Sequence, residues 1–228
     1  MASTSYETGY QKYFGDRMAN VPHEAAGQEE AMRRIYDEWA SDFDKETKEA
    51  GTVYHKPLAE YLDAAIKQVE DKPNSEIKIM DAGAGTGKIG VELKKLGYTN
   101  VQALDISQEM LNEAKNKNVY NKFICTPLSE QRIQEIETGE FDAVICAGTL
   151  IKAHVKSSAL VEIIRMVKIG GLICFTLRYN EVADYQDMML ELENTRRWES
   201  ISKKKVPYFT AGDMPKEAEA FLYKVLKH

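Results

Sequence analysis

The chain has 228 residues, a formal net charge of −6 at pH 7 and 43% hydrophobic residues. A chain of this length can bury one sizeable core, so we expect one compact domain with an N-terminal extension. The negative charge argues against a protein that holds nucleic acid mainly through phosphates, so we expect no nucleic-acid partner. Residues 203–205, the only basic run, are best explained as a solvated edge or turn.

The three cysteines, Cys125, Cys146 and Cys174, lie in apolar β-like segments without C-x-x-C spacing. We interpret them as small buried hydrophobic residues in a reducing compartment, not as a disulfide framework or a metal site. No apolar stretch approaches the roughly 20 residues of a membrane span, and the N-terminus lacks the apolar core of a signal peptide. We therefore expect a cytoplasmic protein with no membrane partner.

The N-terminal region divides into an arm and a helical cover. Residues 1–28 carry Ser, Thr, Gly, Asn and Pro with little periodicity, which predicts a flexible or loosely docked arm. Apolar residues at helical spacing predict helices over residues 29–48 and 57–69. These helices form a cover, residues 29–73, which precedes the sheet and can lie over its ligand-binding edge. The core is expected over residues 74–228.

The core alternates β-like runs with helical patterns, which implies a parallel sheet with right-handed crossovers. The strands are predicted near residues 77–81, 101–105, 121–126, 141–146 and 171–178. The helices are predicted near residues 88–96, 108–117, 129–137 and 157–168. A further helix from residue 179 to about 195 and two β-like runs near 198–209 and 218–226 follow. Trp39 and Trp198 are interpreted as core residues.

The most informative stretch is residues 77–87, which read I-K-I-M-D-A-G-A-G-T-G. It predicts a buried strand that ends at Asp81 and is followed by a turn with Gly83, Gly85 and Gly87. Glycine has no Cβ, so these positions can take positive φ and let the backbone approach a ligand closely. The next β-like run ends at Asp105, which is well placed to accept hydrogen bonds from two ribose hydroxyls. The pattern of strand, glycine turn, helix, strand and acid predicts a nucleoside site.

Three glycine fingerprints compete for this turn. A P-loop needs glycine five positions before Gly87 and Ser or Thr two positions after it, whereas this chain has Ala82 and Ile89. A dinucleotide fingerprint fits residues 85–90, but it starts two residues after the first glycine of the turn. It also leaves Asp81 at the strand end unexplained. A carboxylate there would face a pyrophosphate unfavourably, and it suits a cofactor with a cationic amino group.

D-A-G-A-G-T-G, residues 81–87, resembles the first motif of the class I S-adenosylmethionine-dependent methyltransferases, and residues 103–111 resemble their second. The resemblance runs from about Tyr36 to the C-terminus. The small methyltransferase-like proteins of the Williams–Beuren syndrome region are most similar in residues 36–44, 141–150 and 168–176. The resemblance implies S-adenosylmethionine as cofactor and S-adenosylhomocysteine as its product. It also implies an α/β, Rossmann-like fold: a seven-stranded, mostly parallel sheet with helices on both faces and an antiparallel C-terminal strand.

The resemblance also implies roles for the residues at the first two strand ends. Asp81 would hold the cofactor's amino group, directly or through water, while the three glycines give it room. Asp105 would bind the ribose. Ile106 and Met110 would sandwich the adenine, although Met110 could equally be a plain core residue.

The third and fourth strand ends would complete the cofactor site. Many relatives carry an acid at the third strand end, and this chain has none at residues 125–128. Adenine contacts would therefore come from Thr126, Pro127 and Leu128. The fourth strand end, at Cys146 and Ala147, would pass beside the methionine part of the cofactor.

Four residues are candidates for the acceptor side, and a fifth, Tyr36, is a candidate for the cofactor. His154 follows the fourth strand and is the best candidate for a general base, since an unperturbed pKa near 6.5 suits proton removal at neutral pH. The alternative is a solvated loop histidine. Tyr36 could reach the cofactor carboxylate and Tyr54 the substrate, unless both only pack. His55 and Arg178 could orient an anionic or carbonyl acceptor.

Methyl transfer from a sulfonium needs little acid–base help beyond freeing the acceptor's lone pair, so orientation can supply much of the rate. C-A-G-T at residues 146–149 replaces the N-P-P-Y-like tetrad with which some relatives hold a DNA base or a protein amide. With the acidic charge, this favours an enzyme that methylates an O, N or S atom of a small molecule. Two alternatives are a catalytically silent S-adenosylmethionine-binding interaction module and an NAD-dependent oxidoreductase.

Overall fold

A computed structural model describes residues 15, 17, 27–151, 154–212 and 214–228 of the chain. The predicted arm, residues 1–28, therefore lies almost wholly outside the described residues. Two N-terminal helices precede the sheet, α3 (Gln28–Glu49) and α4 (His55–Val69). The three-residue helix η2 (Asn74–Glu76) leads from α4 into the first strand.

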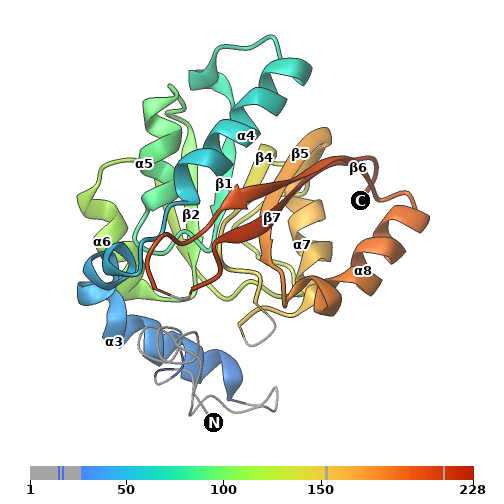
Figure 1. The fold of residues 1–228 in the computed structure, drawn as a ribbon. Coiled ribbons are helices and arrows are strands. Elements are labelled where there is room, and N and C mark those ends of the chain that lie inside the picture. The colour runs from blue at the N-terminus through green and yellow to red at the C-terminus, as the bar shows by residue number, and fades with distance from the viewer. Residues whose placement is uncertain (1–14, 16, 18–26, 152–153, 213) are drawn as a thin grey trace.

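The core is one seven-stranded sheet with the strand order β3-β2-β1-β4-β5-β7-β6 (Figure 1). The first five strands are parallel, and β7 runs antiparallel to both β5 and β6. The strands are β1 (Ile79–Ala82), β2 (Val101–Asp105), β3 (Lys122–Cys125), β4 (Phe141–Cys146), β5 (Val167–Arg178), β6 (Trp198–Pro207) and β7 (Glu217–Val225). The predicted Rossmann-like fold with one antiparallel C-terminal strand is confirmed. Strand order reverses between β1 and β4, which is where ligands bind in such sheets.

Helices cover both faces of the sheet. They are α5 (Lys88–Lys95), α6 (Gln108–Asn116), η3 (Ser157–Ala159), α7 (Leu160–Met166) and α8 (Val182–Asn194). Leu62 of α4 and Leu93 of α5 pack on one face, and Ile163 of α7 and Met189 of α8 pack on the other. Because both faces are covered, β1, β2 and β4 are buried along their whole length. Trp39 and Trp198 are each 1% exposed, as predicted for core residues.

The helix predicted over residues 129–137 is wrong, because the segment between β3 and β4 is a loop. Ile133 and Ile136 of this loop fill the core in place of a helix. Buried Glu162 of α7 accepts the Ile133 N–H at 2.8 Å, and Arg165 donates to the Ile133 carbonyl. These tertiary contacts satisfy backbone groups that a helix would satisfy internally.

The prediction of three buried cysteines is correct for Cys146 and Cys174 and wrong for Cys125. Cys125 ends β3, which is an edge strand, so no neighbouring strand covers it. The lysines at residues 203–205 are exposed on β6, the other edge strand, as predicted for a solvated edge. Within the described ranges, no helix has the length and hydrophobicity of a membrane span.

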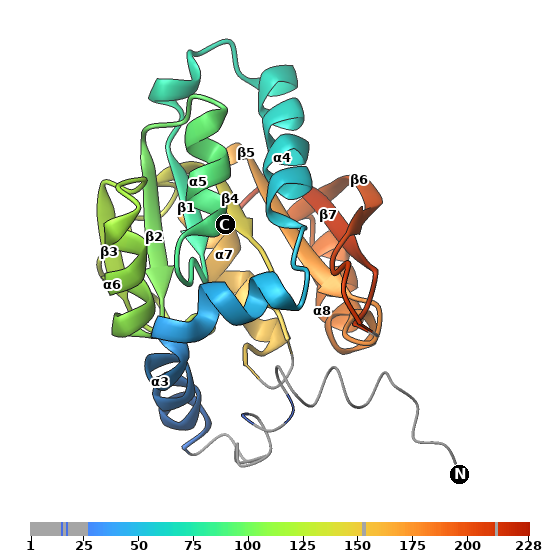
Figure 2. The ribbon, with the colours of Figure 1, turned by 60° about the vertical axis from the view of Figure 1, so that its left-hand side comes forward.

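Helix α3 lies across the carboxyl ends of the strands, beside α6 (Figure 2). Helix α4 packs on a face of the sheet instead, and only Tyr54 and His55 at its N-terminal end reach the cavity beneath α3. The cover therefore meets the ligand-binding edge through α3 and one end of α4.

Candidate active site

The glycine turn after β1 forms one wall of the cavity beneath α3. Gly83, Gly85 and Gly87 have φ values of 78°, 52° and 88°, in the left-handed region that favours glycine. A Cβ on Gly83 would lie 2.1 Å from Oγ1 of Thr149, whereas a Cβ on Gly85 would meet no atom within 4 Å. The turn is therefore closely packed at Gly83 and open at Gly85.

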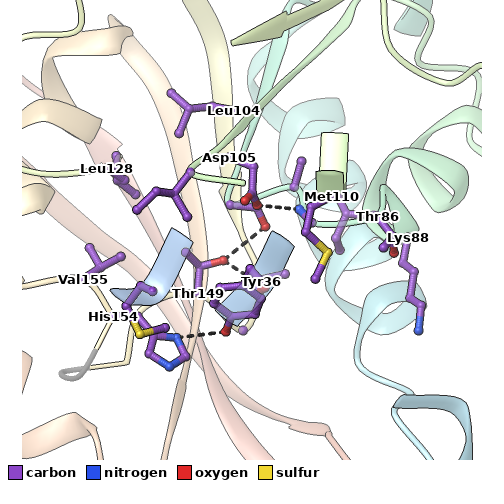
Figure 3. A pocket seen from close by; sticks show the side chains of 18 of the residues that line it. Tyr36, Thr86, Lys88, Leu104, Asp105, Met110, Leu128, Thr149, His154 and Val155 are labelled. Atoms are coloured by element: carbon purple, nitrogen blue, oxygen red, sulfur yellow. Dashed lines mark hydrogen bonds between the residues drawn. The ribbon is translucent and has the colours of Figure 1, made fainter. Parts of the chain in front are cut away.

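Asp105 ends β2 and faces the cavity (Figure 3). The Gly85 N–H donates to its Oδ2 at 2.8 Å, and the Ser107 N–H donates to its Oδ1 at 2.9 Å. Burial raises the pKa of Asp105 to about 6, although these backbone donors oppose the shift. Each carboxylate oxygen can accept a further hydrogen bond. The side chain is thus fixed in orientation and able to accept from two neighbouring hydroxyls.

Asp81 is the next-to-last residue of β1 and is 1% exposed. The Tyr120 hydroxyl donates to Asp81 Oδ2 at 2.6 Å. Among the described residues, Asp81 Oδ1 has no hydrogen-bond partner. Burial raises the pKa of Asp81 to about 7. The hydrogen bond from Tyr120 lowers this pKa, but by less than burial raises it. A buried acceptor without a donor is costly, which makes Oδ1 suited to a cationic donor from a ligand.

Two acids fix α3 over the cavity. Asp44 accepts a hydrogen bond from the Thr86 hydroxyl at 2.6 Å and pairs with Lys117 at 2.8 Å. Asp37 accepts from the Ser107 hydroxyl at 2.6 Å, at the N-terminus of α6. The helix is therefore attached both to the glycine turn and to the segment that follows Asp105.

Aromatic and imidazole rings surround the other end of the cavity. The Tyr36 hydroxyl lies 3.2 Å from Nδ1 of His154, and the two rings meet edge to face (Figure 3). Tyr54 packs between His55 and Tyr208, with ring centroids at 4.2 and 4.3 Å. Burial lowers the pKa of both His55 and His154 to about 3, so each is a neutral imidazole at neutral pH. The pKa of His154 therefore lies well below the unperturbed value near 6.5 that made it the best candidate for a general base in the sequence.

Residues 73–217 match the family described as the methyltransferase domain. The chain belongs to this family. Methyltransferases of the family use S-adenosylmethionine as methyl donor, so this chain is an S-adenosylmethionine-dependent methyltransferase by family and fold.

The methyltransferase is 30% identical over 172 residues to human methyltransferase-like protein 27, covering 73% of this chain and 68% of that protein. It is 29% identical over 127 residues to malonyl-[acyl-carrier protein] O-methyltransferase of Pectobacterium atrosepticum, covering 54% of this chain and 48% of that protein. The match therefore spans about half the length of this second relative.

A solved structure with the same fold is the 1,6-didemethyltoxoflavin-N1-methyltransferase of Burkholderia thailandensis, which holds 1,6-didemethyltoxoflavin and S-adenosylhomocysteine. The TM-score is 0.62 at 16% identity, covering 91% of this chain and 93% of that one.

Most residues predicted for the site line one cavity of about 120 Å³ in this methyltransferase. They are Tyr36, Tyr54, His55, Gly83, Gly85, Asp105, Ile106, Met110, Pro127, Leu128, Ala147 and His154. Met110 lines the cavity and is also buried against Trp39, and its contact with adenine stays a prediction.

Five predicted residues lie outside the cavity lining: Asp81, Gly87, Thr126, Cys146 and Arg178. Tyr120 donates a hydrogen bond to Asp81, and its ring packs against Gly87. The Thr126 N–H donates to the Asp105 carbonyl, and Cys146 is fully buried. Arg178 is buried in an ion pair with Glu181 at 2.7 Å.

Several residues of the site carry no local signal that would have revealed their role. Thr149 packs against Gly83, and Met32 and Phe43 of α3 are among the residues that line the cavity. The helical spacing of Met32 and Phe43 is visible in the sequence, but nothing local places that helix face at the cavity. Tyr120 contacts Asp81 across 39 positions of sequence.

Proposed function

We propose that this methyltransferase transfers the methyl group of S-adenosylmethionine to an O, N or S atom of a small molecule. One observation carries the proposal: the glycine turn and Asp105 share a single cavity with Tyr36, Tyr54, His55 and His154. A nucleoside-binding wall and an acceptor-binding wall in one covered cavity fit a reaction between two small molecules.

The residues at the strand ends fit the cofactor. Asp105 would accept from the two ribose hydroxyls, while Ile106 and Met110 line the space for the adenine. No atom lies within 4 Å of a Cβ placed on Gly85, which leaves room for the cofactor to approach the backbone there closely. Asp81, whose Oδ1 has no hydrogen-bond partner among the described residues, would take the amino group of the methionine part, directly or through water. When bound, S-adenosylmethionine supplies an electrophilic methyl group on a sulfonium.

On the acceptor side, the residues of this chain would orient the acceptor and exclude water from the cavity. Tyr36, Tyr54 and the two histidines offer neutral hydrogen-bonding groups on aromatic surfaces. General-base catalysis by His154 stays a prediction, and it requires the tautomer in which Nδ1–H donates to the Tyr36 oxygen and Nε2 is open. With a pKa near 3, His154 is a weak base, which favours acceptors that have an acidic proton or react through a neutral lone pair.

The relatives differ in their acceptors, so they do not indicate the acceptor of this chain. The name of the Pectobacterium protein specifies a carrier-protein-bound malonyl group, and that of the Burkholderia protein specifies a ring nitrogen. The acidic charge of this chain and the covered cavity support a small acceptor rather than nucleic acid.

The test has two stages. Thermal unfolding is first compared with S-adenosylhomocysteine, S-adenosylmethionine and NAD, since a ligand at a hundred times its Kd stabilises by about 2.7 kcal/mol. A shift with the first two alone supports the proposal, and a shift with NAD alone contradicts it. Asp105→Asn should abolish the shift, while Asp71→Asn, at an exposed position in the linker before β1, should retain it.

The second stage follows release of S-adenosylhomocysteine with small-molecule, protein and RNA acceptors in parallel. Methylation of small molecules alone is the expected result. Methylation of RNA or protein alone would overturn the acceptor class while leaving the cofactor in place.

A further inference from the structure

Tyr120 connects the first turn of α5 to the strand-end acid. It lies in the loop before β3, and its hydroxyl donates to Asp81 Oδ2 at 2.6 Å. The same hydroxyl accepts the Gly90 N–H at 3.1 Å. Because an N–H already donates to the hydroxyl oxygen, the phenol proton is directed to the carboxylate.

The Tyr120 ring is held by two glycines. A Cβ on Gly90 would lie 2.5 Å from the ring, and a Cβ on Gly87 would lie 3.0 Å from it. The ring therefore occupies the space that larger residues at these positions would fill. This packing leaves the hydroxyl little freedom to leave Asp81.

Tyr120 occupies one carboxylate oxygen of Asp81 and leaves the other unpartnered. Oδ1 is buried without a hydrogen bond among the described residues. Among the described residues, the groups whose charge acts on Asp81 or responds to it are Asp105, Tyr54, Tyr120 and Cys146, and none of these four is a cation. A buried carboxylate among acidic and neutral groups is unstable in its charged form unless a ligand supplies the positive charge.

We propose that Tyr120 is a positioning residue that turns Asp81 so that Oδ1 stays available to the cationic amino group of the cofactor. This inference rests on the proposed function. The Tyr120 hydrogen bond also favours the carboxylate form, because it opposes the burial that raises the pKa of Asp81 to about 7. Without the hydroxyl, Asp81 would be mostly protonated at neutral pH and would hold an ammonium group weakly.

Tyr120→Phe tests the inference, since it keeps the ring and removes only the hydroxyl. Binding of S-adenosylhomocysteine and of methylthioadenosine, which lacks the amino acid part, is measured by titration calorimetry on the full chain. We expect about a tenfold weaker affinity for S-adenosylhomocysteine at neutral pH, the effect of one hydrogen bond to a charged group. Methylthioadenosine should bind the variant and the parent protein equally. The loss for S-adenosylhomocysteine should shrink as the pH rises and Asp81 ionises.

Tyr98→Phe is the matched control. Tyr98 is fully buried and donates to Asp63 Oδ1 at 3.0 Å, but it does not line the cavity. Its variant loses the same kind of hydrogen bond and should bind S-adenosylhomocysteine like the parent protein. Equal weakening of both ligands by Tyr120→Phe would indicate a merely structural role and overturn the inference.

Asp81→Asn separates this inference from the proposed function. If Asp81→Asn keeps full affinity for S-adenosylhomocysteine, the proposed role of Asp81 fails. If Asp81→Asn weakens binding and Tyr120→Phe does not, only the role of Tyr120 fails.

Discussion

Asp44 of α3 accepts a hydrogen bond from Thr86 of the glycine turn at 2.6 Å, which joins the helix over the cavity directly to the cavity wall. The cavity measures about 120 Å³, below the roughly 300–1,000 Å³ of typical small-molecule sites. We therefore expect α3 to shift when a cofactor enters, and Asp44 to resist that shift.

Asp44→Ala should speed the dissociation of S-adenosylhomocysteine by about three- to tenfold, the size of a few partly exposed polar contacts. The change should be smaller at high salt, because the pair with Lys117 is partly exposed and screened. Stopped-flow fluorescence of Trp39, on the same helix, would measure the rate. Asp42→Ala is the control, since Asp42 is exposed on α3. Equal rates for Asp44→Ala and the parent protein would contradict the role of α3.

Gly83→Ala and Gly85→Ala should differ although both positions have positive φ. Gly85→Ala adds backbone strain alone and should cost about 1–2 kcal/mol of unfolding free energy. Gly83→Ala also drives a methyl group against Thr149, which should cost about 1–3 kcal/mol more. Urea unfolding measures both. Similar losses would show that Thr149 yields easily to the added methyl group.

The strand-end residues could be predicted because their signals are local. Asp81 and Asp105 each follow an apolar run, and parallel strands bring their carboxyl ends to one edge, so adjacent positions in sequence were sufficient. The loop over residues 129–137 could not be predicted, because buried Glu162 and Arg165, more than twenty positions away, satisfy its backbone. Helical spacing alone carries no information about such partners.

The sequence alone also could not predict that α3 packs over the cavity or that Tyr120 is the hydrogen-bond partner of Asp81. Asp44 and Thr86 are 42 positions apart, and Tyr120 and Asp81 are 39 apart. Asp44 is one of several acids on a charged helix, so composition alone does not distinguish it from exposed Asp42. The histidine pKa values also depend on burial, which the loop sequence around His154 does not reveal.

Asp81→Asn should change how stability depends on pH. The pKa of Asp81 rises from 3.8 to about 7 in the folded protein, so the folded state binds this proton more tightly. The resulting stability is fully present below about pH 4 and is lost as the pH rises through 7. Each tenfold change in an acid dissociation constant corresponds to about 1.4 kcal/mol, so the ligand-free variant should be a few kcal/mol more stable than the parent protein at alkaline pH.

Thermal unfolding across the pH range measures the effect of Asp81→Asn. The advantage of the variant should disappear toward acidic pH, where Asp81 is protonated in the parent protein. Asp105 has a pKa raised to about 6 and contributes in the same direction in both proteins, so the difference between them reports Asp81 together with its electrostatic interaction with Asp105. A difference that does not vary with pH would contradict a raised pKa for Asp81.

His154→Gln should lower kcat without changing the shape of its pH profile. The pKa of His154 lies near 3, so the imidazole stays neutral from about pH 5 to 8 and contributes no inflection near 6.5. Glutamine keeps a hydrogen-bonding group near Tyr36 but places it differently, which we expect to cost about tenfold in kcat. Saturating S-adenosylmethionine removes the titration of Asp81 from the measurement, because the bound ammonium group holds Asp81 ionised. An inflection near 6.5 in the parent protein that is absent from the variant would show that His154 titrates in its ordinary range during turnover, and that α3 does not shield it from solvent.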